Sequence, residues 1–175
     1  MAFAKLPPEI LRQHKGSSFV GVTTVFLCHD GRGKVFLAKR SKNARDEHGR
    51  WSPGAGGLKH GQSLEQNVRR ELKEENAAEA LKIDYMGYMD VFRNLADGTP
   101  THWLAMNFAV LVDPKQMQIN EPDMFDDSGW FTLDNLPSPP HSQFETFMNL
   151  HGDTLKKILQ SNEHIRLLDK KAINE

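Results

Sequence analysis

Hydrophobic positions follow two different periods along the chain, which predicts a mixture of strands and helices. Residues 17–30 and 34–40 are rich in β-branched and aromatic side chains, a composition typical of strands. The sequence Asp-Gly-Arg-Gly between them is a turn signal and predicts a hairpin. Residues 81–94 and 101–113 predict two further strands, and residues 129–133 predict a short final strand.

Helical features occur in three other segments. Residues 7–15 open with two prolines and predict a short helix. A longer helix begins at Ser63, because Ser63 and Gln66 match a capping box and apolar residues then recur every four positions. Residues 141–171 predict a helical C-terminal segment.

Strands both before and after one central helix predict an α/β (α+β) fold with a mixed sheet and helices packed on its faces. The 175 residues suggest one domain. We divide the chain into an N-terminal extension (1–16), a main domain (17–140) and a C-terminal helical segment (141–175) that packs on the same domain.

Composition narrows the classes of function. The net charge is −1 and the pI is about 6.7, which gives no support to a general attraction for nucleic acid or membrane surfaces. The start of the chain lacks the long apolar stretch of a signal peptide. The single cysteine, Cys28, lies in an apolar run and excludes an intrachain disulfide. These features predict a cytoplasmic protein without membrane contacts.

Candidate chemistry appears in the segment Arg-Arg-Glu-Leu-Lys-Glu-Glu-Asn of the central helix. Glu71, Glu74 and Glu75 have the i, i+3, i+4 spacing that places side chains on one helix face. Such like charges destabilise a helix by roughly 0.2–0.5 kcal/mol per pair, and Arg70 can relieve only part of this repulsion. A divalent cation bound by carboxylate and phosphate oxygens would relieve it. The alternative is a solvated helix face.

The loop of residues 41–62, which precedes the helix, points to an anionic ligand. Its glycines let the backbone approach a ligand closely, and a helix N-terminus behind such a loop suits phosphate. Basic residues outnumber acidic ones in and just before this loop. The candidate substrate-binding residues are Arg40, Arg45, Gly56 and Gly57. For the two arginines, the alternative is a solvated loop cation.

These residues resemble the Nudix box of the Nudix hydrolase family. Gly56 is followed by five residues to Gln62 and then by seven to Arg70-Glu71, and Leu72, a spacer and Glu74-Glu75 complete the matching part. The resemblance implies an αβα sandwich and a metal-dependent pyrophosphohydrolase that cleaves a nucleoside diphosphate linked to another group. The substrate would be a nucleoside triphosphate or a nucleotide sugar.

The resemblance also implies roles for individual residues. A Mg²⁺ or Mn²⁺ centre would use box glutamates, a backbone carbonyl and an acidic residue of a late loop. Arg70 would fix a box glutamate, and the catalytic set would be Glu71, Glu74, Glu75 and Arg70. The expected metal ligands are Ala55, Glu71, Glu74, Glu75 and Glu121.

Two positions depart from the box and keep alternatives open. Gln62 replaces a glutamate, and Ala77 replaces a glycine, so that the helix is expected to continue or to end without a left-handed cap. An alternative function is therefore a catalytically weak or inactive nucleotide-binding sensor. An isoprenoid diphosphate isomerase is disfavoured because Cys28 lies well before the box. Capped RNA ends also remain possible substrates, and a homodimer remains a possible oligomeric state.

Overall fold

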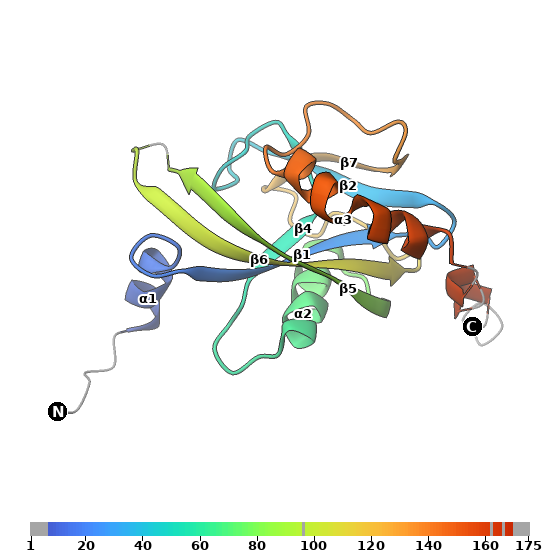
Figure 1. Ribbon diagram of the computed structural model, residues 1–175, viewed down its shortest axis with the longest axis horizontal. Coiled ribbons are helices and arrows are strands. Elements are labelled where there is room, and N and C mark those ends of the chain that lie inside the picture. The colour runs from blue at the N-terminus through green and yellow to red at the C-terminus, as the bar shows by residue number, and fades with distance from the viewer. Residues whose placement is uncertain (1–6, 96, 162, 166, 170–175) are drawn as a thin grey trace.

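The computed structural model describes residues 7–95, 97–161, 163–165 and 167–169. Helices lie on both sides of a seven-stranded sheet (Figure 1). In chain order, the elements are α1 (Pro8–His14), β1 (Gly21–His29), β2 (Lys34–Arg40), β3 (Trp51–Ser52), β4 (Gly54–Gly57), α2 (Leu64–Asn76), β5 (Ala80–Asn94), β6 (Pro100–Val112), β7 (Phe125–Thr132) and α3 (Phe144–Leu159). No helix among these described residues is long and apolar enough to cross a membrane.

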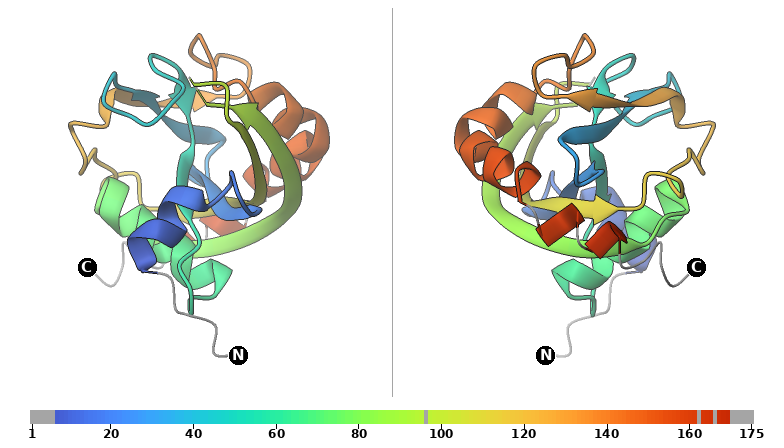
Figure 2. Two further views of the ribbon diagram at one scale, coloured as in Figure 1. Left: turned by 90° about the vertical axis from the view of Figure 1, so that its left-hand side faces the viewer. Right: turned by 90° about the vertical axis from the view of Figure 1, so that its right-hand side faces the viewer.

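β1 is the central strand of the sheet. Along one edge it pairs in parallel with β6, which in turn pairs antiparallel with β5. Its other edge is shared, since β4 pairs with residues 23–26 and β2 pairs only at His29. β2 then continues away from β1 and pairs with β3 and β7. The sheet therefore divides into two wings beyond the middle of β1, and Figure 2 shows β5 and β6 as a strongly curved hairpin on one side.

Alternation along the strands builds two separate cores. In β1, Phe26 and Cys28 pack in the cluster under α2, whereas Leu27 packs in the cluster under α3. In β2, Phe36 and Val35 divide in the same way. Successive side chains of a strand point to opposite faces, so an almost wholly apolar strand contributes side chains to both cores. This arrangement confirms the predicted mixed sheet with helices on both faces.

The beginning of α2 follows the sequence prediction closely. Ser63 accepts a hydrogen bond from the Gln66 backbone N–H, and the Gln66 side chain accepts one from the Ser63 N–H. The prediction for the end of the helix was wrong. Ala77 takes the left-handed conformation with φ of 53°, and its N–H donates to the Lys73 carbonyl. Alanine thus fills the cap that the family pattern gives to glycine.

The structure also corrects several boundaries. Segment 41–62, predicted as a loop, contains β3 and β4. Their two and four residues are too short and too glycine-rich to show a strand pattern. β7 begins at Phe125 rather than residue 129, because its acidic first half pairs with β2. α3 begins at Phe144 and ends at Leu159, and residues 163–165 and 167–169 are helical, as predicted. Residues 162, 166, 170 and 171 of the predicted helical segment lie outside the described residues, as do residues 1–6 of the N-terminal extension.

Candidate active site

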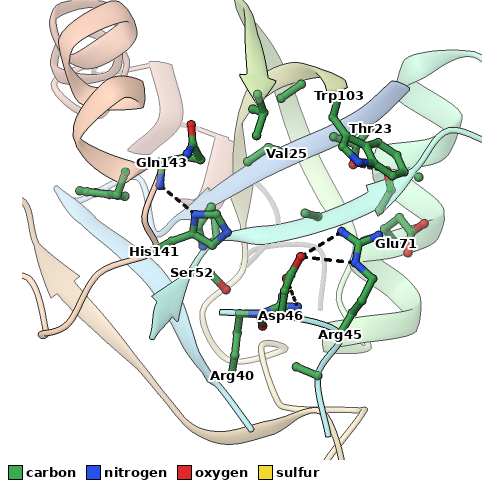
Figure 3. Close-up of a pocket in the computed structure, with 18 of the residues that line it drawn as sticks. Thr23, Val25, Arg40, Arg45, Asp46, Ser52, Glu71, Trp103, His141 and Gln143 are labelled. Atoms are coloured by element: carbon green, nitrogen blue, oxygen red, sulfur yellow. Dashed lines mark hydrogen bonds and ion pairs between the residues drawn. The ribbon is translucent and has the colours of Figure 1, made fainter. Parts of the chain in front are cut away.

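A cavity of about 420 Å³ lies between the two wings of the sheet and the start of α3. This volume is in the range of small-molecule sites. Figure 3 shows its centre, with residues that come from β1, β2, β6, α2 and two loops. Eight of the residues predicted from the sequence line it, namely Arg40, Arg45, Ala55, Gly56, Gly57, Glu71, Glu75 and Glu121. Arg70 and Glu74 are not among its lining residues.

The glycines of β4 make room for two carboxylates. A Cβ at Gly56 would overlap the carboxylate end of Glu71, and a Cβ at Gly54 would lie 2.9 Å from Glu75 Oε2. The Gly56 carbonyl accepts hydrogen bonds from Thr23, Thr24 and Asn67. β4 is therefore fixed between β1 and α2, and both carboxylates lie directly over its backbone.

Both carboxylates are held in surroundings that disfavour their charge. Glu75 is only 8% exposed. Burial raises its pKa well above the ordinary value, and the charges of Glu71 and Glu121 raise it further, while the Ala55 N–H and Arg40 oppose the rise. Burial also raises the pKa of Glu71, against the influence of Arg70. Like charges at low exposure favour protonation or a bound cation.

Arg70 organises the outer side of the helix. Its guanidinium donates to Glu71 and to Glu74, each at 2.5 Å, and to Asn67 at 2.7 Å. Its Nε donates to Gln62 Oε1 at 3.3 Å. Gln62 thus keeps a hydrogen bond to Arg70 without the negative charge of a glutamate. Glu74 faces solvent, with 47% of its side chain exposed.

The loop before β7 brings Glu121 to the cavity. The Asn120 N–H donates to the Glu75 carbonyl at 2.8 Å, and its side-chain amide donates to the Glu74 carbonyl at 2.9 Å. Upstream, Asn76 and Gln118 are also hydrogen-bonded to each other. This loop is therefore joined to the last turn of α2, which explains how a residue about fifty positions away lies near Glu75.

These carboxylates have the donor chemistry that a hard divalent cation requires. In the described part of the chain, no three His, Cys, Asp or Glu side chains are arranged as a metal site. One reason is visible in the structure, because Glu71 points an oxygen at Arg70 and Glu75 is bound by the Ala55 N–H. The side chains are of the chemical type that binds a divalent cation. To bind one, Glu71 would have to give up its hydrogen bond with Arg70.

In the same cavity, three arginines surround one carboxylate. Asp46 lies 3.1 Å from Arg40, 3.3 Å from Arg45 and 3.2 Å from Arg93. Burial alone would raise the pKa of Asp46, but the arginines hold it below the ordinary value. Arg45 also lies over the Trp103 ring at 5.4 Å, a cation–π contact. We call these residues, Arg40, Arg45, Arg93 and Asp46, the arginine cluster.

Sequence reasoning did not select Asp46, Arg93 or the other end of the cavity. That end is mostly apolar, and its wall comes from the inner faces of β5 and β6 and from α3. The residues there include Met89, Val91, Trp103, Ala105, Phe144 and Phe147. A signal for Arg93 was present, because it follows Met89 and Val91 at the two-residue spacing of one strand face.

His141 stands where the two ends of the cavity meet. Its Nδ1 accepts a hydrogen bond from the Gln143 N–H at 3.1 Å, and Figure 3 shows both residues. Burial lowers the pKa of His141, although Glu47 opposes this, so the ring is neutral with its proton on Nε2 near pH 7. Cys28, in contrast, is buried in the core under α2 and does not line the cavity.

Comparison with known proteins gives one family. The NUDIX domain model matches residues 19–149. The fold is similar to the MutT NUDIX hydrolase of Burkholderia pseudomallei, with a TM-score of 0.66 and 24% identity over 75% of this chain and 98% of that one.

Two further solved structures have the same fold. The NUDIX domain of Shewanella oneidensis NrtR, in complex with ADP ribose, has a TM-score of 0.59 and 21% identity over 86% of this chain and 99% of that one. The MutT protein of Methanosarcina mazei Go1 has a TM-score of 0.58 and 22% identity over 74% of this chain and 94% of that one.

Proposed function

Because the chain belongs to the Nudix domain family, a family of hydrolases of phosphoanhydride bonds, we propose that it is a metal-dependent pyrophosphohydrolase. Its substrate is a nucleoside diphosphate linked to a further group, either a phosphate or a sugar. The observation that carries this proposal is the cavity that brings Glu71, Glu75 and Glu121 together with the arginine cluster. Acidic groups for a cation beside basic groups for phosphate suit a diphosphate.

The apolar end of the cavity supports a nucleotide rather than inorganic pyrophosphate. Phe144 offers an aromatic surface against which a base can pack, and Trp103 lies between this end and the arginine cluster, in contact with Arg45. The NrtR domain of the same fold binds ADP ribose, which is a nucleotide of this general class.

The proposed centre uses Mg²⁺ or Mn²⁺, held by Glu71, Glu75 and Glu121 with the Ala55 backbone beside them. When bound, such an ion neutralises phosphate charge and lowers the pKa of its water. Arg40 and Arg45 bind phosphate oxygens by charge-assisted hydrogen bonds, and Gly56 and Gly57 let the substrate approach the backbone closely. Arg70 positions Glu71, and Glu74 shares the guanidinium of Arg70.

The two departures from the box support the enzyme rather than the sensor. Gln62 still contacts Arg70, and Ala77 still closes the helix in the left-handed conformation. Each replacement therefore keeps a local contact, to Arg70 in one case and to the last turn of the helix in the other. The sensor alternative is consistent with the lack, among the described residues, of three His, Cys, Asp or Glu side chains arranged as a metal site, and the test below separates the two.

The test is a substrate panel with Mg²⁺ that contains nucleoside triphosphates, sugar nucleotides, dinucleotides and capped RNA, with products identified by chromatography. Glu75→Gln keeps the size of the side chain and removes its charge, so we expect the rate to fall by a hundredfold or more, in the range of about 10²–10³ for a lost transition-state interaction. Glu65→Gln is the matched control, because Glu65 pairs with Arg69 on the exposed first turn of α2. It should keep the wild-type rate.

Two results would overturn the proposal. One is the absence of any Mg²⁺-dependent product across the panel while nucleotide binding persists, which would favour the sensor. The other is an unchanged rate for Glu75→Gln on a substrate that the wild-type protein hydrolyses.

A further inference from the structure

The arginine cluster contains more positive charge than its one carboxylate can balance. Three guanidinium groups contact Asp46, so positive charge exceeds negative charge within the cluster. The neighbouring Glu47 offsets part of this excess, because it lies 3.7 Å from Arg93, but it is shared with Arg50 and with the backbone and hydroxyl groups of Ser142. Burying unbalanced charge is costly, so this end of the cavity is built to receive further negative charge.

Burial separates the cluster into buried and exposed members. The side chains of Arg40 and Arg93 are only 19% and 21% exposed, whereas that of Arg45 is 61% exposed. Arg40 Nε also donates to the Asp46 backbone carbonyl at 2.8 Å, so the backbone can stay in place while the carboxylate turns away. Arg40 and Arg93 are therefore the buried members of the cluster, and Arg45 is its exposed member.

A second observation points to a ligand in the same place. Ser52 lines the cavity and is 3% exposed, yet its hydroxyl has no hydrogen-bond partner among the described residues. Ser52 pairs with Ala38 across β2 and β3, and Arg40 follows Ala38 on the same face of β2. An unused buried hydroxyl is rare in native proteins, and here it adds a donor beside the arginines.

We propose that Asp46 is an internal counter-ion that occupies a phosphate subsite formed by Arg40, Arg45, Arg93 and Ser52. The substrate's phosphate displaces the Asp46 carboxylate and takes over its arginine contacts. This inference rests on the function proposed above and specifies its substrate class. Once Asp46 is displaced, the three guanidinium groups favour a terminal phosphate, which carries about −1.5 to −2 at pH 7, over a phosphate esterified on both sides, which carries one negative charge. The substrate class is a nucleotide that ends in a free phosphate, such as a nucleoside triphosphate.

The first test measures binding without turnover, by calorimetric titration of the full chain with inorganic phosphate in the absence of divalent metal. Asp46→Asn removes the competing charge and should bind phosphate about tenfold more tightly than the wild-type chain, a difference of about 1.4 kcal/mol. Glu65→Gln removes one negative charge from an exposed ion pair elsewhere and should leave phosphate binding unchanged. Arg45→Gln, at the exposed arginine, should weaken it.

The second test uses kinetics to identify the substrate class. Arg45→Gln should raise the KM for a nucleoside triphosphate about tenfold and leave the KM for a nucleoside diphosphate sugar within twofold. Equal effects on both substrates would overturn the assignment of a terminal phosphate.

The phosphate-binding measurement tests the subsite independently of catalysis. Phosphate binding that is no tighter in Asp46→Asn than in the wild-type chain, or that persists in Asp46→Asn/Arg45→Gln, would overturn the subsite even if the chain hydrolyses nucleotides. Conversely, loss of turnover in Glu75→Gln with intact phosphate binding would support both proposals separately. Unfolding curves of each variant, with and without phosphate, show that a loss of binding is not a loss of folding.

Discussion

At the scale of single residues, the candidate site depends on side chains that are absent as much as on those that are present. Gly56 has no Cβ, and the Glu71 carboxylate fills the space that a Cβ would occupy. The atoms that would be displaced belong to the end of a flexible side chain. A larger residue at position 56 would therefore move the carboxylate without breaking the fold.

We expect Gly56→Ala to lower kcat/KM by roughly a hundredfold, because a displacement of about 1 Å in a catalytic group has that effect. Gly152→Ala in α3 is the control, since its Cβ would make an ordinary contact of 3.4 Å with Met148. It should retain full activity. Steady-state kinetics and thermal unfolding of both variants check the prediction, and wild-type activity in Gly56→Ala would contradict it.

A buried histidine gives the protein a predictable response to acid. His29 is fully buried in β1. Burial lowers its pKa to about 3, with further contributions from His164 and Lys82, while the unfolded value is about 6.5. Below pH 6.5, His29 binds a proton in the unfolded chain but stays neutral in the folded chain until the pH approaches 3. The stability therefore falls as the pH decreases from about 6.5 toward 3, by roughly 1.4 kcal/mol per pH unit for this group.

We expect His29→Gln, which cannot titrate in this range, to show a shallower loss of stability between pH 6.5 and pH 4. Urea unfolding at several pH values measures the free energy of unfolding. His60→Gln, on the exposed loop before α2, should keep the wild-type slope. The explanation fails if the slope of His29→Gln is as steep as that of the wild-type chain.

At the scale of elements, helix α2 begins at a capping box that the sequence encodes and ends at a residue with a strained backbone conformation. The capping box at Ser63 satisfies the first backbone N–H groups of the helix. At the other end, Ala77 adopts a left-handed conformation that costs residues with a Cβ roughly 1–2 kcal/mol. Contacts of the following residues keep it there, because Ala78 is buried in the core under α2.

We expect Ala77→Gly to raise the free energy of unfolding by about 1 kcal/mol, since glycine adopts this conformation without strain. Ala80→Gly is the matched control. Ala80 is the first residue of β5 and is not among the residues with positive φ, so this change should lower stability by roughly 0.5–1 kcal/mol. Denaturant unfolding compares the two, and a destabilised Ala77→Gly variant would contradict the prediction.

At the scale of the whole molecule, the site is assembled from segments that are distant in the sequence. β4 supplies the glycines, α2 supplies Glu71 and Glu75, and the loop before β7 supplies Glu121. The last turn of α2 holds that loop through Asn120. The relative position of Glu75 and Glu121 thus depends on a contact between two parts of the fold rather than on either part alone.

We expect Asn120→Ala to lower kcat/KM about tenfold with little change in stability, because a single hydrogen bond contributes about 0.5–1.5 kcal/mol. Gln118→Ala is the control, since the hydrogen bonds that join Gln118 to Asn76 use backbone atoms of Gln118, and it should behave as the wild-type chain. If Asn120 acts through Glu121, then Asn120→Ala/Glu121→Gln should be no slower than Glu121→Gln alone. Additive losses would show that Asn120 acts in another way.

The sequence determined the features that depend on local order. It determined the α2 capping box, the spacing of Glu71 and Glu75 on one helix face, and most strands, because side-chain periodicity and turn residues act within a few positions. Only the tertiary structure decided that Glu74 faces solvent, that Glu121 reaches Glu75, and that Arg93 meets Arg40 and Arg45 at Asp46. These positions follow from how the sheet divides at β1 and how loops pack against α2, and such long-range pairing leaves no signal in the local pattern.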